Sequence, residues 1–219
     1  MKLIQHFSII VFIAMTPLLR AQSYNFDVSK YITVSFPLEP QLVEDDGLNM
    51  FYHKSENGMM SVTVTPPTPF SVHNQVELEK VYSGNLAAIR KKGVLLEKKE
   101  VELEKCKALY ALYQIEYPNN LNLFAESYAL YFRKNLYTFT YMTPNLSNPL
   151  AQAEKNDFFE SLVVHNQNGT ISQLDTAPEN SLIQESNSGS WFVIGEIIGV
   201  LLVILIVGVL LYSYRDKIF

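Results

Sequence analysis

The chain of 219 residues contains one cysteine, Cys106, and its thiol is the side chain best suited to covalent chemistry. Lys105 and Lys107 flank it, and neighbouring cations lower the pKa of a thiol and so favour the nucleophilic thiolate. Nucleophilic catalysis also needs a base, yet none of the four histidines lies close to Cys106 in the sequence. The pattern therefore favours an ordinary cysteine in a hairpin turn. A single cysteine also excludes an intramolecular disulfide.

The other chemistry-bearing residues form no known motif. His53, His73 and His165 share no ligand spacing such as His-x-x-x-His. The acidic run at 44–46 lacks the alternating ligands of a calcium loop. Phosphate-binding, dinucleotide-binding and nucleophile-elbow motifs are absent from the sequence. We therefore expect no metal, no cofactor and no catalytic residue. The alternative that stays open is an enzyme or small-ligand receptor with a pocket near Cys106 or His53.

Tyrosine is abundant between residues 110 and 141 and gives a candidate binding surface. Strand alternation places Tyr137, Phe139 and Tyr141 on one face of a predicted strand. Two interpretations remain for these rings. They fill the space between a sheet and a helix, or they form a solvent-facing patch that binds a partner through flat aromatic faces.

Residues 191–213 are predicted to form a transmembrane helix. Their 23 residues would reach about 34 Å as a helix, enough to cross a hydrocarbon core of about 30 Å. Basic residues follow at positions 215 and 217, whereas residues 166–190 contain no lysine or arginine. The positive-inside rule then places the tail, 214–219, in the cytoplasm and the rest of the chain outside.

Residues 1–21 have the parts of a secretory signal peptide. Lys2 precedes an apolar stretch, and Ala21 is a small residue suited to cleavage. An uncleaved anchor is the alternative, and both export the chain that follows. The predicted localisation is thus the cell membrane, with a single span, an outward N-terminal domain that is periplasmic in a Gram-negative bacterium, and a cytoplasmic C-terminus.

Within the predicted span, Gly195 and Gly199 form a Gly-x-x-x-Gly spacing, which lets two helix backbones approach closely. Homodimerisation through these glycines is one hypothesis. Glycine is also common in such spans without a partner, so the spacing alone leaves both interpretations open.

The region between the two ends divides into a domain, 22–165, and a polar linker, 166–190. The linker is rich in serine and asparagine and is predicted to be flexible, because it has few apolar residues to bury. Within the domain the sequence predicts three strands, a helix, four strands and a helix. The strands are expected at 31–36, 48–53, 59–65, 94–104, 108–117, 123–132 and 136–143, with helices after Asn74 and from Pro149.

This element order predicts an α+β fold, an antiparallel sheet of about six to seven strands with helices packed against it. An Asn57-Gly58 hairpin is expected between the second and third strands. In the final helix, the inward positions are predicted to be Leu150, Ala153, Phe158 and Leu162.

The opening YITVSFP, the strand pair, the helix ending in Lys-Lys-Gly at 91–93, the tyrosine-bearing strands and the final helix with FFESL resemble the PsbP-like fold. That group includes an extrinsic subunit of photosystem II, a Ran-binding nuclear transport factor and many exported bacterial proteins. The resemblance covers about residues 25–164. It implies an α/β sandwich that serves as an accessory or binding module, usually without catalysis, and it assigns no functional residue.

A net charge of −5 argues against nucleic acid as a partner, because phosphate binding needs a surplus of basic residues. The predicted function is that of a single-pass, membrane-anchored envelope protein. Its outward domain is expected to act as a binding or assembly module for a protein partner. A eukaryotic type I surface protein is a further alternative, with glycosylation at Asn145 and Asn168.

Overall fold

A computed structural model of the chain describes residues 23–45, 48–65, 72–117, 121–165 and 173–174. The predicted signal peptide, the predicted span with Gly195 and Gly199, and the tail lie outside the described residues. So does most of the predicted linker. Among the residues that are described, no helix has both the length and the apolar character needed to cross a membrane.

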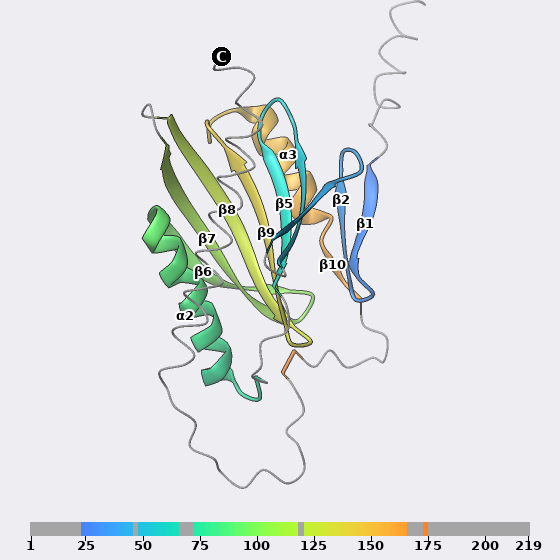
Figure 1. Cartoon of the computed structure of the whole chain (residues 1–219), viewed down its shortest axis with the longest axis vertical. Helices are drawn as coiled ribbons and strands as arrows, with labels where there is room; N and C mark the ends of the chain where they lie inside the picture. The colour runs from blue at the N-terminus through green and yellow to red at the C-terminus, as the bar shows by residue number, and fades with distance from the viewer. Residues whose placement is uncertain (1–22, 46–47, 66–71, 118–120, 166–172, 175–219) are drawn as a thin grey trace, which may run out of the picture.

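The described residues form a seven-stranded antiparallel sheet, a three-stranded antiparallel sheet and two helices (Figure 1). In chain order the elements are β1 (Tyr24–Ser29), β2 (Ile32–Phe36), β3 (Gln41–Asp45), β4 (Leu48–Lys54), β5 (Met59–Thr65), α2 (Gln75–Lys92), β6 (Val94–Leu103), β7 (Cys106–Tyr117), β8 (Leu121–Phe132), β9 (Asn135–Thr143), α3 (Pro149–Glu160) and β10 (Val163–Val164). The large sheet has the order β3-β4-β5-β9-β8-β7-β6, and the small sheet has the order β1-β2-β10. The predicted α+β class is confirmed.

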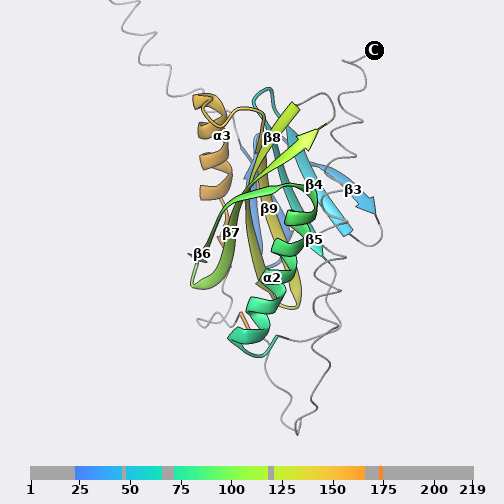
Figure 2. The same ribbon diagram turned by 90° about the vertical axis from the view of Figure 1, so that its left-hand side faces the viewer.

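Both faces of the large sheet are buried, each under a different cover (Figures 1 and 2). On one face α2 packs through Leu78, Tyr82, Leu86 and Ile89. On the other face lie α3 and the small sheet, which contributes buried side chains from β2. The strands therefore carry apolar side chains on both faces, as a sheet between two covering layers requires.

The predicted strand at 31–36 exists, but it does not belong to the large sheet. As β2 it pairs antiparallel with β1 and with β10, two strands that were not predicted. In β1 the apolar residues Tyr24, Phe26 and Val28 alternate with polar ones, a signal that the prediction missed, whereas β10 is only two residues long. The large sheet gains β3 instead, which also escaped prediction.

Helix α2 begins as its sequence predicts. The Asn74 side chain accepts a hydrogen bond from the Glu77 N–H at 3.0 Å, and the Glu77 carboxylate accepts one from the His73 N–H at 2.7 Å. The predicted Asn57-Gly58 hairpin also forms between β4 and β5. Gly58 is needed there because a Cβ atom would lie 2.5 Å from the Met142 carbonyl oxygen of β9.

For α3, two of the four predicted inward positions are wrong. Leu150 is 63% exposed and Ala153 is exposed as well, whereas Ala151 and Phe158 are buried. Ala151 and Phe158 are seven residues apart, so they lie on nearly the same side of the helix. Glu154 and Lys155 occupy the turn between them and bond to the sheet, so the inner face carries two charged residues that a search for apolar spacing passes over.

The predicted flexible linker contains two residues that are docked on the domain. Gln173 is 9% exposed, and Leu174 packs against the cluster under α2. The register of β7 and β8 ends at Leu109 opposite Ala129, so two residues further on Lys107 would face Tyr131. An antiparallel pair of this kind normally exchanges two backbone hydrogen bonds.

At this position two side chains take the place of those bonds. The Gln173 amide oxygen accepts from the Lys107 N–H at 2.9 Å, and its nitrogen donates to the Tyr131 carbonyl at 3.0 Å. The Tyr82 hydroxyl accepts from the Tyr131 N–H at 3.2 Å and donates to the Lys107 carbonyl at 2.7 Å. Burial raises the pKa of Tyr82, so its hydroxyl keeps the proton that it donates. Gln173 thus closes an open end of the β7–β8 ladder, and the prediction of a uniformly flexible linker is wrong for these two residues.

Replacing Gln173 by alanine should destabilise the domain by about 1–3 kcal/mol, because the Lys107 N–H and the Tyr131 carbonyl each lose a hydrogen bond to the Gln173 amide. Hydrogen exchange of the Lys107 amide should accelerate in the full-length Gln173→Ala variant, and urea unfolding should shift to a lower midpoint. Gln173→Glu should be worse than alanine, since a carboxylate cannot donate to the Lys107 and Tyr131 carbonyls, as the amide nitrogen does at 2.6 and 3.0 Å.

Gln184→Ala, at a second glutamine of the same predicted linker, is the matched control and should leave both measurements unchanged. Unaltered Lys107 exchange in Gln173→Ala would show that this side chain does not close the ladder.

Candidate functional site

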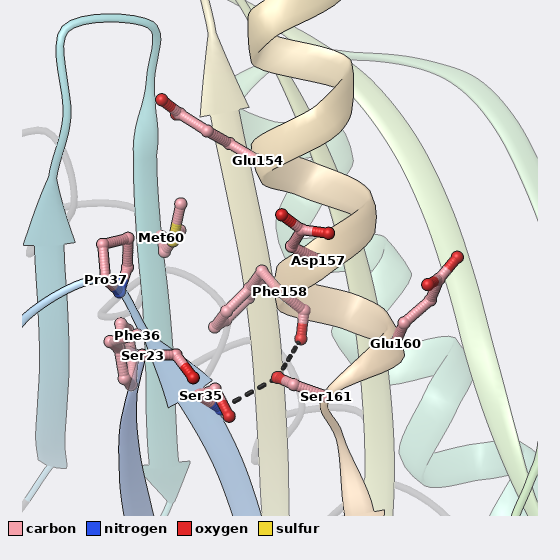
Figure 3. A pocket seen from close by; sticks show the side chains of 10 residues that line it. All are labelled: Ser23, Ser35, Phe36, Pro37, Met60, Glu154, Asp157, Phe158, Glu160 and Ser161. Carbon is pink, nitrogen blue, oxygen red and sulfur yellow. Dashed lines mark hydrogen bonds between the residues drawn. The ribbon is translucent and has the colours of Figure 1, made fainter. Parts of the chain in front are cut away.

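A cleft of about 560 Å³ lies between α3 and strands β2 and β5 (Figure 3). Apolar side chains form its floor: Phe36 and Pro37 from β2 and its end, Met60 from β5 and Phe158 from α3. Helix α3 also contributes carboxylates at three-residue spacing, Glu154, Asp157 and Glu160. This spacing brings the three acids to one side of the helix. The result is an apolar floor with an acidic edge.

Ser161 fixes the lower end of α3 against β2. Its hydroxyl oxygen accepts a hydrogen bond from the Ser35 N–H at 2.8 Å and donates to the Phe158 carbonyl at 2.7 Å (Figure 3). The last carbonyl groups of a helix have no partner within the helix, and the Ser161 hydroxyl supplies one for the Phe158 carbonyl. Phe158 points from the helix toward Met60 and Phe36 across the floor (Figure 3).

Glu154 fixes the middle of α3 against the β4–β5 hairpin and β9. Its carboxylate accepts from the Ser55 hydroxyl at 2.6 Å, the Asn57 amide at 2.7 Å and the Tyr141 hydroxyl at 3.2 Å. Burial and the negative charge of Glu154 raise the pKa of Tyr141, which therefore remains a neutral donor. Glu154 has a structural task, whereas Asp157 and Glu160 are exposed and free to meet a ligand.

On its other flank, α3 is tied to the sheet by a largely buried ion pair. Lys155 lies 2.7 Å from Glu126 of β8, with side chains 14% and 12% exposed, and the Tyr110 hydroxyl donates to the same carboxylate at 3.1 Å. A smaller cavity of about 260 Å³ lies beside this pair and is lined by Tyr128, Phe159 and Leu103 among others. Removing one member of such a pair leaves a charge buried, so we assign Glu126 and Lys155 to holding the helix.

The surroundings of Cys106 raise the pKa of its thiol, whereas the neighbouring lysines in the sequence suggested that the pKa would be lowered. The side chain is fully buried in the cluster under α3, while Lys105 and Lys107 point to solvent. Burial, followed by the carboxylates of Glu102 and Glu104, raises the pKa of the thiol to about 11. The thiol is therefore protonated at neutral pH.

His53 lies far from Cys106. Following the strand pairing across the sheet from His53 in β4 leads to Leu112 in β7, four strands away. Leu112 is six residues from Cys106 along β7. At about 4.8 Å per strand and 3.3 Å per residue, the two residues are on the order of 25 Å apart. Burial lowers the pKa of His53. Neither residue lines the cleft or the cavity beside Lys155.

The three histidines of the domain lie on separate elements. The His165 N–H donates to the Tyr31 carbonyl at 2.6 Å, and its ring lies 3.0 Å from the Thr33 hydroxyl. His73 precedes α2, and His53 is in β4. Throughout the described part of the chain, no three His, Cys, Asp or Glu side chains come together in a way that could hold a metal ion.

The aromatic patch predicted for Tyr137, Phe139 and Tyr141 is not exposed. The three rings do share one face of β9, as alternation predicted, but each is at most 2% exposed and belongs to the cluster under α3. The solvent-facing interpretation is therefore wrong for these residues, because α3 and the small sheet cover that face. The three rings instead fill the space between the large sheet and its cover of α3 and the small sheet.

Sequence reasoning missed the residues that line the cleft. Glu154, Asp157 and Glu160 recur every three residues in the predicted final helix, and this spacing was the available signal. Ser35 and Phe36 gave no signal, because only the fold brings β2 beside a helix that lies more than 100 residues later in the sequence. Asn145, in the predicted glycosylation sequence, is exposed, and Asn168 lies outside the described residues.

No protein-family model matches the chain, and no curated protein matches it. Among solved structures, a Pseudomonas aeruginosa protein of unknown function, described as a putative regulator, is similar at 12% identity and a TM-score of 0.44, covering 67% of this chain and 99% of that one. The cyanobacterial PsbP (CyanoP) of Synechocystis sp. PCC 6803 is similar at 14% identity and a TM-score of 0.44, covering 66% and 94%.

A Bacteroides thetaiotaomicron protein is similar at 11% identity and a TM-score of 0.41, covering 67% of this chain and 50% of that one. These similarities are too distant to place the chain in a family. Membership of the PsbP-like group stays a prediction, and the function has to be inferred from the residues themselves.

Cys106 should be almost inert toward thiol reagents in the folded protein. With a pKa of about 11 rather than 9, the thiolate fraction at pH 8 falls about 100-fold, and burial slows the reaction further. We expect the native full-length chain to react with a disulfide reagent at pH 8 at least about 100-fold more slowly than the urea-unfolded chain. Comparable rates in the two states would revive Cys106 as a nucleophile.

Proposed function

We propose that the protein is a single-pass, membrane-anchored envelope protein whose outward domain is a binding or assembly module. The signal-like residues 1–21 and the apolar segment 191–213 support the anchor and the orientation. Homodimerisation through Gly195 and Gly199 stays a prediction of the sequence. The proposed binding site is the cleft beside α3.

The observation that supports this proposal is that the cleft combines an apolar floor with an acidic edge. Phe36, Met60 and Phe158 offer apolar surface, and Asp157 and Glu160 place negative charge beside it. None of the described residues that line the cleft is a lysine or an arginine. The ligand that fits is a segment of a partner protein with apolar side chains next to lysine or arginine, because the charges are complementary and the apolar side chains gain from burial.

The cleft is also held in one shape before any ligand arrives. Ser161 anchors its lower end to β2, and Glu154 anchors its upper end to the β4–β5 hairpin. A preformed site loses less conformational entropy on binding than a flexible one. No covalent chemistry is needed for this function, which agrees with the buried, protonated state of Cys106.

The test is binding of a short peptide of lysine, leucine and serine to the full-length chain in nanodiscs of neutral lipid. A peptide with glutamate in place of lysine is the comparison, and empty discs are the blank. The lysine peptide should bind and the glutamate peptide should not. Asp157→Asn combined with Glu160→Gln should weaken binding about 3- to 10-fold, the range for two exposed ion pairs.

Glu100→Gln combined with Glu102→Gln is the matched control. It removes two exposed carboxylates from β6, away from the cleft, and changes the net charge by the same amount. Equal binding of both peptides, or an equal loss in this control, would show that the cleft does not select a basic segment.

A further inference from the structure

The turns at one end of the large sheet present a group of exposed basic residues. They come from the β1–β2, β6–β7 and β8–β9 connections and from the first residues of β7. The group, here called the basic end, consists of Lys30, Lys105, Lys107, Arg133 and Lys134, all of them exposed. Two carboxylates, Glu102 and Glu104, lie beside it. The local excess is positive in a chain whose net charge is −5.

Contacts between the turns bring the basic residues together. The guanidinium of Arg133 lies 5.0 Å from the centre of the Tyr31 ring, and the ammonium of Lys30 lies 4.7 Å from the same ring. Tyr31 also packs on Phe132 at 5.8 Å between ring centres. A partly buried tyrosine between two cations is the arrangement favoured at a membrane interface, where amphipathic rings and basic side chains collect.

Two of the turns hold these residues in a costly backbone conformation. The φ angles are 47° and 69° at Glu104 and Lys105, and 52° and 68° at Arg133 and Lys134. Two-residue hairpins with positive φ at both central positions are normally made by asparagine and glycine. Charged side chains at all four positions cost stability that glycine would avoid, and such outliers motivate a functional hypothesis.

The predicted linker, here called the tether, is attached to the domain at this same end through Gln173. Gln173 bonds to Lys107 next to the β6–β7 turn and to Tyr131 next to the β8–β9 turn, and the trace of Gln173–Leu174 lies beside these turns in Figure 1. The stretch from the last docked residue to the predicted span is residues 175–190, which is 16 residues. As a coil it would span about 20–24 Å, whereas the 12 residues of β7 extend about 40 Å toward the other end of the domain.

We propose that the basic end is a membrane-docking surface that binds an anionic lipid bilayer and turns the cleft-bearing domain to a fixed orientation. This inference rests on the proposed membrane anchor. The tether keeps the basic end near the bilayer, but a coil longer than the Debye length of about 8 Å does not by itself hold that end in contact with the lipids. Attraction between the basic residues and anionic lipids supplies this contact, so removing the positive charges should release the basic end.

Energy transfer from single labelled sites to acceptor-labelled lipids tests this in the full-length chain, in a Cys106→Ala background. One label replaces Asn135 at the β8–β9 turn, and the other replaces Glu56 in the β4–β5 turn at the opposite end of the sheet. In nanodiscs with anionic lipid, transfer from position 135 should be about twofold higher or more than from position 56. In neutral discs, or at about 1 M salt where the Debye length is about 3 Å, the difference should shrink.

The triple variant Lys105→Gln, Lys107→Gln and Lys134→Gln should lose the difference in anionic discs. The matched control Lys80→Gln, Arg90→Gln and Lys98→Gln, which removes three exposed cations elsewhere, should keep it. Equal transfer from both positions in chains that are integrated into anionic discs overturns the docking surface and leaves the anchor standing. Failure of the chain to integrate into any disc overturns the proposed anchor together with this inference.

Discussion

The large sheet is apolar on both faces, and this constraint determines how the rest of the domain is arranged. In β9, Tyr137 and Phe139 enter one cluster while Leu136 and Met142 enter the other. Neither face can be left in water without a large loss of hydrophobic stabilisation, so two covering layers are required. Helix α2 covers one face. Helix α3 alone is too short for the second, and the small sheet that contains β2 completes the cover.

Helix α3 is positioned as much by charge as by apolar packing. Glu154 and Lys155 are adjacent in sequence, yet one bonds to the β4–β5 hairpin and β9 and the other to Glu126 of β8. The two contacts hold opposite flanks of the helix, and each flank borders a cavity. Buried polar contacts of this kind tolerate few alternative positions, because a shifted helix would leave a charge without its partner. The shape of the cleft thus follows from residues that anchor the helix.

The sequence predicted the elements whose signals are local. The Asn74 cap, the Asn57-Gly58 hairpin and the strands with two-residue alternation all form as expected. The inward face of α3 was mispredicted, since Glu154 is a polar residue at an inner position and Leu150 is an apolar one at an outer position. The sequence also could not reveal the cleft, because β2 and α3 meet only through the fold. Whether Tyr137, Phe139 and Tyr141 face solvent also depends on the cover by α3 and the small sheet, so the sequence left both interpretations open.

The amino-acid composition of the linker predicted flexibility, and the prediction failed at Gln173 because of the chemistry of its side chain. A primary amide carries the same donor and acceptor groups as a peptide bond, so the Gln173 side chain can stand in for a strand where Lys107 and Tyr131 no longer pair. Gln173 belongs to no periodic pattern of apolar residues, yet its side chain takes the place of a strand's backbone hydrogen bonds. It meets Tyr82 of α2, on the face opposite the cleft beside α3. Attachment of the tether and occupation of the cleft therefore use different faces of the sheet, and a ligand held by Asp157 and Glu160 need not displace Gln173.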